Sequence, residues 1–192
     1  METSLSWLAR LTRAPDEGDW KQLLDVYGPL LHAWLARSGV TAADHDDLIQ
    51  EVLIVIVRNV AEFDHRGPGA FRAWLRTILA NRVRDYFRGR AGRAVAAGGT
   101  AAWIQLEELA DPESAMSRLW NREHDEHVAA RALERVQVDF AETTWQAFAR
   151  QVLEGRPAQD VAAELGISRN AAIVAKSRVL SRVRAELAGL IG

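Results

Sequence analysis

The sequence contains no cysteine, no long apolar run and little net charge, and each absence removes a class of protein. Without cysteine the chain has no disulfide framework and no thiolate metal site, which is typical of a reducing cytoplasm. The longest uninterrupted apolar run, Val52–Val57, has six residues, whereas roughly 20 are needed to span a bilayer. Residues 1–15 lack the apolar core and small-residue cleavage site of a secretion signal. The sequence therefore predicts a cytoplasmic protein without membrane association.

Motifs that carry out catalysis or hold a cofactor are also missing. There is no nucleophile elbow, phosphate-cradling glycine loop or zinc-protease helix. His124 and His127 stand at i and i+3 and could share a metal, but they lack a cysteine or a third ligand, so we predict surface residues. The Asp44, Asp46 and Asp47 cluster lacks the spacing of a calcium loop, and complementing a helix dipole explains it more simply. We expect no enzyme, no metal and no cofactor.

The net charge of −2 conceals a strong segregation of charge along the chain. Acidic residues gather at 44–51 and through 107–139, whereas two other segments are strongly basic. The first basic segment holds Arg72, Arg76, Arg82, Arg84, Arg88, Arg90 and Arg93 against one acid, and the second holds Arg169, Lys176, Arg178, Arg182 and Arg184 against none. Two basic patches separated by acidic stretches predict two nucleic-acid contacts and a protein partner, with solvated helix faces as the alternative.

Apolar residues recur with helical spacing almost everywhere, and strand-like alternation is scarce. The sequence predicts an all-α fold of two small helical domains joined by a flexible linker: residues 1–92, linker 93–112 and residues 113–192. The Gly/Ala/Arg-rich stretch 89–100 has too little large apolar content to pack firmly. The tryptophans lie mostly on apolar stripes, so we expect them in the core, Trp74 among them. The expected helices are 3–12, 19–39, 44–62 with an acidic cap at Asp44, 70–90, a long helix ending near 138, and a smaller helical domain.

Residues 158–184 have the pattern of a helix-turn-helix. A short helix with Val161 and Ala162 facing inward leads to Gly166 at the turn, and Ser168 can cap the next helix. The small residues Ala162 and Ala172 allow the two helices to pack closely. The exposed face would then carry possible readers of duplex DNA: Ser168, Arg169, Asn170, Ile173, Val174 and Ser177, with Lys176 and Arg178 towards the phosphates. A helical hairpin that serves only packing is the alternative.

Residues 44–90 combine an acidic ridge with a basic and aromatic helix. Asp47, Gln50 and Glu51 fall at i, i+3 and i+4, so they share one polar face opposite an apolar one. The following helix interleaves arginines with Phe71, Trp74, Tyr86 and Phe87, which suits single-stranded DNA because bases can stack while arginines hold the backbone.

The string D-x-D-D-L-I-Q-E-V at 44–52, followed by F-R-A-W-L-R-T-I-L-A-N-R-V-R-D-Y-F-R at 71–88, resembles region 2 of sigma-70 family factors of the extracytoplasmic-function (ECF) type. The C-terminal helix-turn-helix resembles their region 4. The resemblance covers roughly residues 1–92 and 113–190 in the family's order, without a region 3 between them. One departure is that Ile173-Val174-Ala175 stands where family members commonly have a basic residue and Ser-Arg.

The resemblance implies a DNA-binding subunit that directs core RNA polymerase to promoters and opens the DNA. Asp46, Asp47, Gln50 and Glu51 would dock on the clamp helices of the beta-prime subunit. Region 4 would read the minus-35 element through Ser168, Arg169, Asn170, Ile173, Lys176, Ser177 and Arg178, and would pack on the beta flap. The minus-ten element would be recognised and melted by residues 71–90, with Asn81 near the pocket for a flipped base and Arg72, Arg76, Arg84 and Arg88 on the DNA. The resemblance also allows an anti-sigma factor as a partner.

Two other functions stay open on the sequence. The first is a stand-alone helix-turn-helix regulator whose N-terminal half is a dimerisation or sensing bundle. The second is a protein-interaction bundle that makes no contact with DNA. Co-purification with core RNA polymerase and promoter-specific transcription would separate both from a sigma factor.

Overall fold

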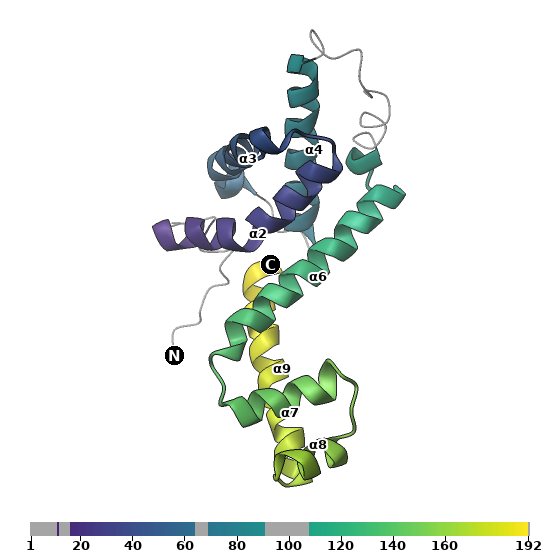
Figure 1. The fold of residues 1–192 in the computed structure, drawn as a ribbon. Helices are drawn as coiled ribbons and strands as arrows, with labels where there is room; N and C mark the ends of the chain where they lie inside the picture. The colour runs from purple at the N-terminus through teal and green to yellow at the C-terminus, as the bar shows by residue number, and fades with distance from the viewer. Residues whose placement is uncertain (1–10, 12–15, 64–68, 91–107, 192) are drawn as a thin grey trace. The chain divides into compact units, whose positions relative to one another are not determined.

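The computed structural model describes residue 11 and residues 16–63, 69–90 and 108–191 (Figure 1). Every regular element in these ranges is a helix, which confirms the all-α prediction. The chain forms two compact units, residues 1–128 with 191–192, and residues 129–190. The expected helix 3–12 and linker residues 93–107 lie outside the described ranges, except for Leu11, which is buried. None of the described helices is long and apolar enough to cross a membrane.

Helix α2, Glu17–Arg37, begins at a reciprocal capping box. The Asp16 carboxylate accepts from the Asp19 amide at 2.8 Å, and the Asp19 side chain accepts from the Asp16 amide at 3.3 Å, so two otherwise unpaired donors are satisfied. The helix runs through Pro29, although proline removes one backbone hydrogen bond. A continuous buried face explains why the helix persists, and its members after the proline are Leu30, Leu31, Trp34 and Leu35.

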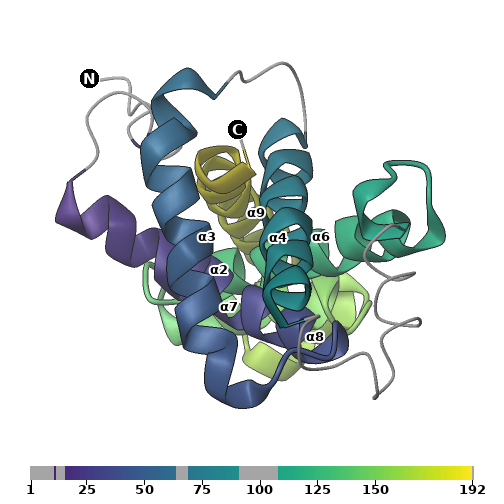
Figure 2. The same cartoon turned by 90° about the horizontal axis from the view of Figure 1, so that it is seen from above.

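Helices α3, His45–Asn59, and α4, Ala70–Arg90, complete the core of the first unit with α2. Short 3₁₀ turns, Ala42–Asp44 and Val60–Glu62, flank α3. The buried side of α3 packs against α2 and α4, and Figure 2 shows α3 and α4 side by side. The packed residues of α3 are Leu48, Ile49, Val52 and Ile56.

The expected cap at Asp44 is wrong in its mechanism. The Asp44 side chain makes no capping hydrogen bond to α3. Its carboxylate instead accepts from the Tyr86 hydroxyl at 2.8 Å and pairs with Arg90 at 3.0 Å. A charge-assisted contact with two partners competes with the helix amides for the same oxygens. Asp44 therefore ties the start of α3 to the end of α4.

Helix α6, Ala115–Gln137, contributes to both units, and its first half belongs to the first one. Ser117, Trp120, His124 and Val128 recur at helical spacing and are buried. The prediction of His124 on the surface is therefore wrong, because this polar residue occupies a core position. Trp74, expected in the core, is only partly buried and stacks on Phe63 with ring centroids 4.8 Å apart.

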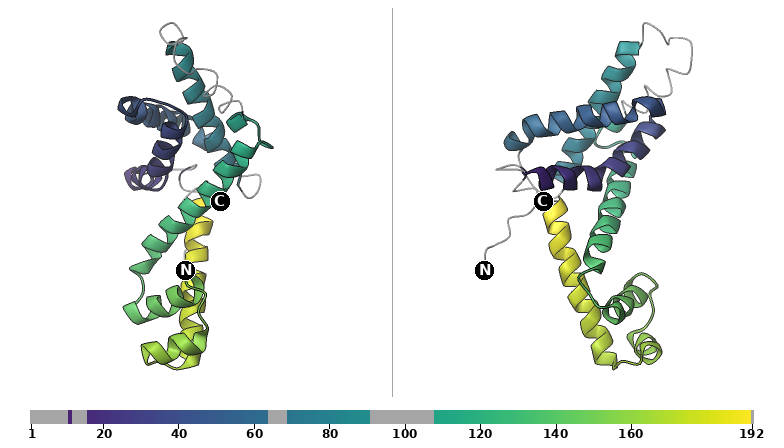
Figure 3. Two further views of the ribbon diagram at one scale, coloured as in Figure 1. Left: turned by 45° about the vertical axis from the view of Figure 1, so that its right-hand side comes forward. Right: turned by 60° about the vertical axis from the view of Figure 1, so that its left-hand side comes forward.

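The second unit consists of residues 129–137 of α6 with α7, Glu142–Val152, α8, Ala158–Leu165, and most of α9, Arg169–Ile191 (Figure 3). Val136, Phe148, Val179 and Val183 form one buried cluster. Ala147, Val161 and Ala175 form a second, in which α7, α8 and α9 meet. These two clusters hold the helix-turn-helix on a small packed base.

Candidate nucleic-acid and partner interfaces

The acidic ridge of α3 is open to solvent as the sequence predicts. Asp46, Asp47, Gln50 and Glu51 are all exposed, opposite the buried Leu48 and Val52. The exposed face continues with Ile54 and Val57, whose exposed fractions are 47% and 49%. An acidic ridge that ends in exposed aliphatic residues can combine charge complementarity with apolar contact when it meets a protein partner.

Asp46 differs from the rest of the ridge because a histidine pair approaches it. His32 Nε2 lies 3.2 Å from the Asp46 carboxylate, and the Nδ1 atoms of His32 and His45 lie 3.5 Å apart. His45 Nε2 lies 3.1 Å from the Val40 carbonyl, so that nitrogen must donate. His32 therefore lies between the Asp46 carboxylate and the buried His45.

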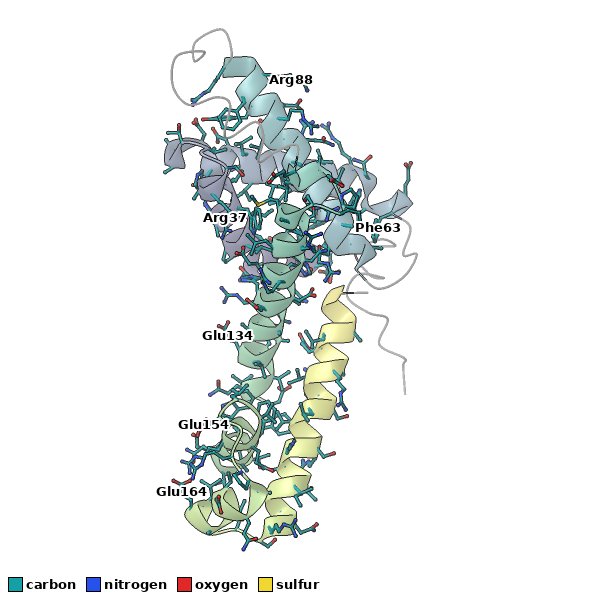
Figure 4. The ribbon with its side chains drawn as sticks, turned by 90° about the vertical axis from the view of Figure 1, so that its right-hand side faces the viewer. Arg37, Phe63, Arg88, Glu134, Glu154 and Glu164 are labelled. Atoms are coloured by element: carbon teal, nitrogen blue, oxygen red, sulfur yellow. The ribbon has the colours of Figure 1, made fainter. Side chains whose placement is uncertain are left out.

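The second half of α4 presents its polar side chains outward. Asn81 is exposed, and its side-chain oxygen accepts from Arg84 at 2.9 Å. Asp85 pairs with Arg82 at 2.6 Å and also with Arg88, whose side chain is 64% exposed (Figure 4). These ion pairs are shallow and exposed, so they cost little to break. This end of α4 can exchange its own carboxylate for another anion.

The first half of α4 is different, because residues before and within α6 engage its arginines. Arg72 is ion-paired with Asp125 of α6, and its carbonyl accepts from Trp120 Nε1 at 3.2 Å. Arg76, one turn later, is 4% exposed, and its Nε has no hydrogen-bond partner among the described residues. Burial, with the nearby Arg72, lowers the pKa of Arg76, against an opposing pull from Asp111. The structure thus separates Arg72 and Arg76 from Asn81, Arg84 and Arg88.

His124 stands at the centre of the α6 contact with the first unit. Its Nδ1 lies 3.1 Å from the Asp125 carboxylate, whereas its Nε2 is buried and has no hydrogen-bond partner in the part of the chain that the structure describes. Burial lowers the pKa of His124 to about 4, even though Asp125 favours the charged form. The physical reason is that a second ring hydrogen, on Nε2, would meet no acceptor. The same burial, with the charge of Asp125, raises the pKa of the enclosed Tyr27 hydroxyl.

The helix-turn-helix has the local geometry that the sequence predicts. Gly166 closes α8 in a left-handed conformation with φ +66°, where a residue with a Cβ is strained. Ser168 Oγ accepts from the Ala171 amide at 3.1 Å and caps α9. Lys176 is partly buried, and the other candidate readers are exposed: Ser168, Arg169, Asn170, Ile173, Ser177 and Arg178. The structure brings the seven candidates onto the first turns of one helix.

A groove of about 630 Å³ runs beside these residues and includes Arg156, a basic residue outside the two basic segments of the sequence. It is lined by Ile173, Lys176, Ser177 and Arg184 of α9, by Gln151 of α7 and by Arg156 of the turn before α8. Arg156 is held by Glu164 at 2.7 Å. Arg184, a member of the second basic segment, lies two turns beyond Lys176 on the same helix. Among the residues that the structure describes, no three histidine or carboxylate side chains are grouped to hold a metal ion.

A known protein family matches the part of the chain that carries the acidic ridge and α4. The model of the family described as "Sigma-70 region 2" matches residues 23–93, which include α3 and α4. RNA polymerase sigma factor CnrH of Cupriavidus metallidurans is 29% identical over 190 residues, covering 96% of this chain and 92% of that protein.

Two further matches are to proteins named as sigma factors. The probable RNA polymerase sigma factor RfaY of Xanthomonas campestris pv. campestris is 28% identical over 145 residues, which is 76% of this chain and 34% of that longer protein. A solved structure of CnrH in complex with the cytosolic domain of CnrY shares 22% identity over 94% of each chain, with a TM-score of 0.38.

Proposed function

The chain belongs to the sigma-70 family of RNA polymerase sigma factors, ECF type, and on this premise we propose that it directs core RNA polymerase to specific promoters in the cytoplasm and promotes opening of the DNA. Members of this family are initiation factors and not enzymes. The observation that carries the proposal is that one compact unit presents an acidic ridge on α3 beside a basic, aromatic helix α4.

The ridge of Asp46, Asp47, Gln50 and Glu51 docks on the clamp helices of the beta-prime subunit. Its exposure and its position opposite the core support this role, because a partner can reach all four side chains without unfolding the unit. Asp47 and Glu51 carry most of the attraction, since His32 already contacts the Asp46 carboxylate. Ile54 extends the contact with an apolar surface.

The end of α4 holds the opened strand of the minus-ten element. Asn81, Arg84 and Arg88 lie at this end, and Arg72 and Arg76 lie at the start of the same helix. Arginines that track a backbone, together with aromatic rings and a pocket for an unstacked base, offset an unpairing cost of about a few kcal/mol per base without ATP.

The helix-turn-helix reads the minus-35 element as duplex while it packs on the beta flap. Arg169 and Asn170 stand at the start of α9, where a recognition helix meets base edges in the major groove. Lys176 and Arg184, in the adjoining groove, suit phosphates on either side of the read bases.

Binding of the Asp47→Lys, Glu51→Lys double variant to core polymerase tests the proposal. We expect the variant to lose more than about a hundredfold in affinity, because attraction becomes repulsion on an exposed ridge. Its helical circular dichroism and urea midpoint should stay those of the parent. Asp25→Lys, an exposed acid on α2, is the matched control. If the double variant binds polymerase as the parent does, or if the parent supports no transcript, the assignment fails.

A further inference from the structure

The contact between the first half of α6 and α4 has a role that the proposed function does not include. Residues Ala115–Val128 are a helical segment whose inner face is buried in the first unit. That segment contacts the start of α4 at Arg72, one of the proposed DNA-binding arginines. The geometry points to an internal competitor for DNA: residues 115–128 occupy the Arg72 guanidinium and must release it before that arginine can hold the minus-ten strand. This inference rests on the proposed function.

A carboxylate stands where a phosphate would be needed. Asp125 places its carboxylate on the Arg72 guanidinium. A guanidinium that is already paired with a carboxylate cannot also take a phosphate in the same fork geometry. Hydrogen bonds from Arg72 and His124 outweigh burial and lower the pKa of the Asp125 carboxyl, so this competitor is charged at neutral pH. The segment therefore mimics the anion that Arg72 is proposed to bind.

Contacts along the whole segment hold it in place. At its centre Trp120 packs edge-on against Trp34 with centroids 5.2 Å apart, and its indole hydrogen is donated to the Arg72 carbonyl. On one side Arg37 pairs with Glu123 at 2.9 Å and lies over the Trp34 ring. One turn later His127 donates to the Val26 carbonyl. Residues 115–128, which we call the latch, are therefore fixed to α2 and α4 by several specific contacts.

The latch can leave α2 and α4 reversibly, because its ion pairs are weak and only its apolar contacts are strong. The Arg37–Glu123 and Arg72–Asp125 pairs are partly exposed and each contributes little. The apolar part around Trp120 contributes more but involves a single helix face. A ligand that binds only the released state shifts the equilibrium by its preference for that state. A DNA strand that gains Arg72 on release would supply this preference.

A reversible cross-link tests the latch, and the absence of cysteine from the chain makes it clean. Cysteines placed at Arg37 and Glu123 are joined by a short reducible bis-thiol cross-linker, with each single-cysteine variant treated in parallel. Holoenzyme is assembled with core polymerase, and opening of a promoter selected by that holoenzyme is measured. We expect the cross-link to leave polymerase binding intact, to lower promoter opening by about tenfold or more, and to be reversed by reductant.

A charge variant gives a second reading that does not depend on cross-linking. Asp125→Asn keeps the shape of the side chain but removes the ion pair with Arg72, and should raise promoter opening about two- to fivefold. Glu126→Gln, the exposed neighbour on α6, removes the same charge and should leave opening unchanged. Equal opening by cross-linked and reduced holoenzyme, or equal effects of the two charge variants, would overturn the latch. If the reduced protein neither binds polymerase nor opens any promoter, the proposed function itself fails.

Discussion

Helices α4 and α9 are both basic and both proposed to meet promoter DNA, yet the structure treats them differently. The start of α9 leaves Arg169 and Asn170 exposed beside a groove. The start of α4 has Arg72 paired and Arg76 buried. Both helices are rich in basic residues, so the difference in exposure comes from the distant residues that pack against each helix. Basic residues on a helix show where nucleic acid could bind, but accessibility depends on the tertiary contacts of that helix.

Removing the indole of Trp120 should have the largest effect, because this side chain contacts both Trp34 of α2 and Arg72 of α4. Trp120→Ala deletes a fully buried side chain at the centre of the α6 contact, and should lower the free energy of unfolding of the first unit by about 3–5 kcal/mol. Urea unfolding followed by circular dichroism measures it. Trp145→Ala, at a half-buried site in the second unit, should cost clearly less. A nearly neutral Trp120→Ala would mean that α6 is not part of the first core.

Acid should weaken the same contact through His124. Its pKa is about 4 in the folded chain and about 6.5 in an unfolded one, so the folded state favours the neutral ring. The stability it contributes is complete above pH 6.5 and is lost as pH falls towards 4, to an extent of about 3 kcal/mol.

Comparison with a variant that cannot titrate isolates this contribution. His124→Leu removes the titrating ring, so the difference in unfolding free energy between parent and variant should fall between pH 7 and 4. Carboxylates such as Asp125 titrate in both proteins and largely cancel in the difference. A difference in unfolding free energy that does not change with pH would contradict this, because it would mean that folding leaves the pKa of His124 unchanged.

The smallest effect concerns the open helix. Arg169→Ala should relax promoter choice at a single upstream base pair, at a cost of about 1–3 kcal/mol in discrimination, because one bidentate contact to a base edge is lost. Transcription from a promoter library with every base substituted at each minus-35 position measures it. A uniform loss across all sequences would instead make Arg169 a phosphate contact. Because Arg169 is already exposed, we expect no release step before its contact with DNA.

Local signals predicted most of the helices and the shape of the helix-turn-helix. The boundaries of α4, the left-handed Gly166 and the Ser168 cap depend on residues within a few positions of one another. Asp44 was assigned to the wrong partners because its competitors, Tyr86 and Arg90, lie more than forty positions away. A local pattern cannot decide between a cap and a distant ion pair that use the same oxygens.

Long-range packing also explains what the sequence did not reveal about the candidate site. The charge pattern indicated which residues of α4 are basic, but the contact of Trp120 with Arg72 joins positions 48 apart. His124 was expected on the surface because histidine is a poor indicator of burial. Its spacing from Trp120 and Val128, at i−4 and i+4, was the available sign that it shares their buried face.

The edge-on pair of Trp34 and Trp120 also provides an optical reporter of the state of α6. Two indoles at 5.2 Å are close enough for their excited states to couple, whereas separated indoles absorb independently. Loss of the resulting couplet in the far-ultraviolet circular dichroism would mark departure of α6 from α2 without any added dye. In the isolated protein the couplet can therefore report whether α6 is in place or has left α2.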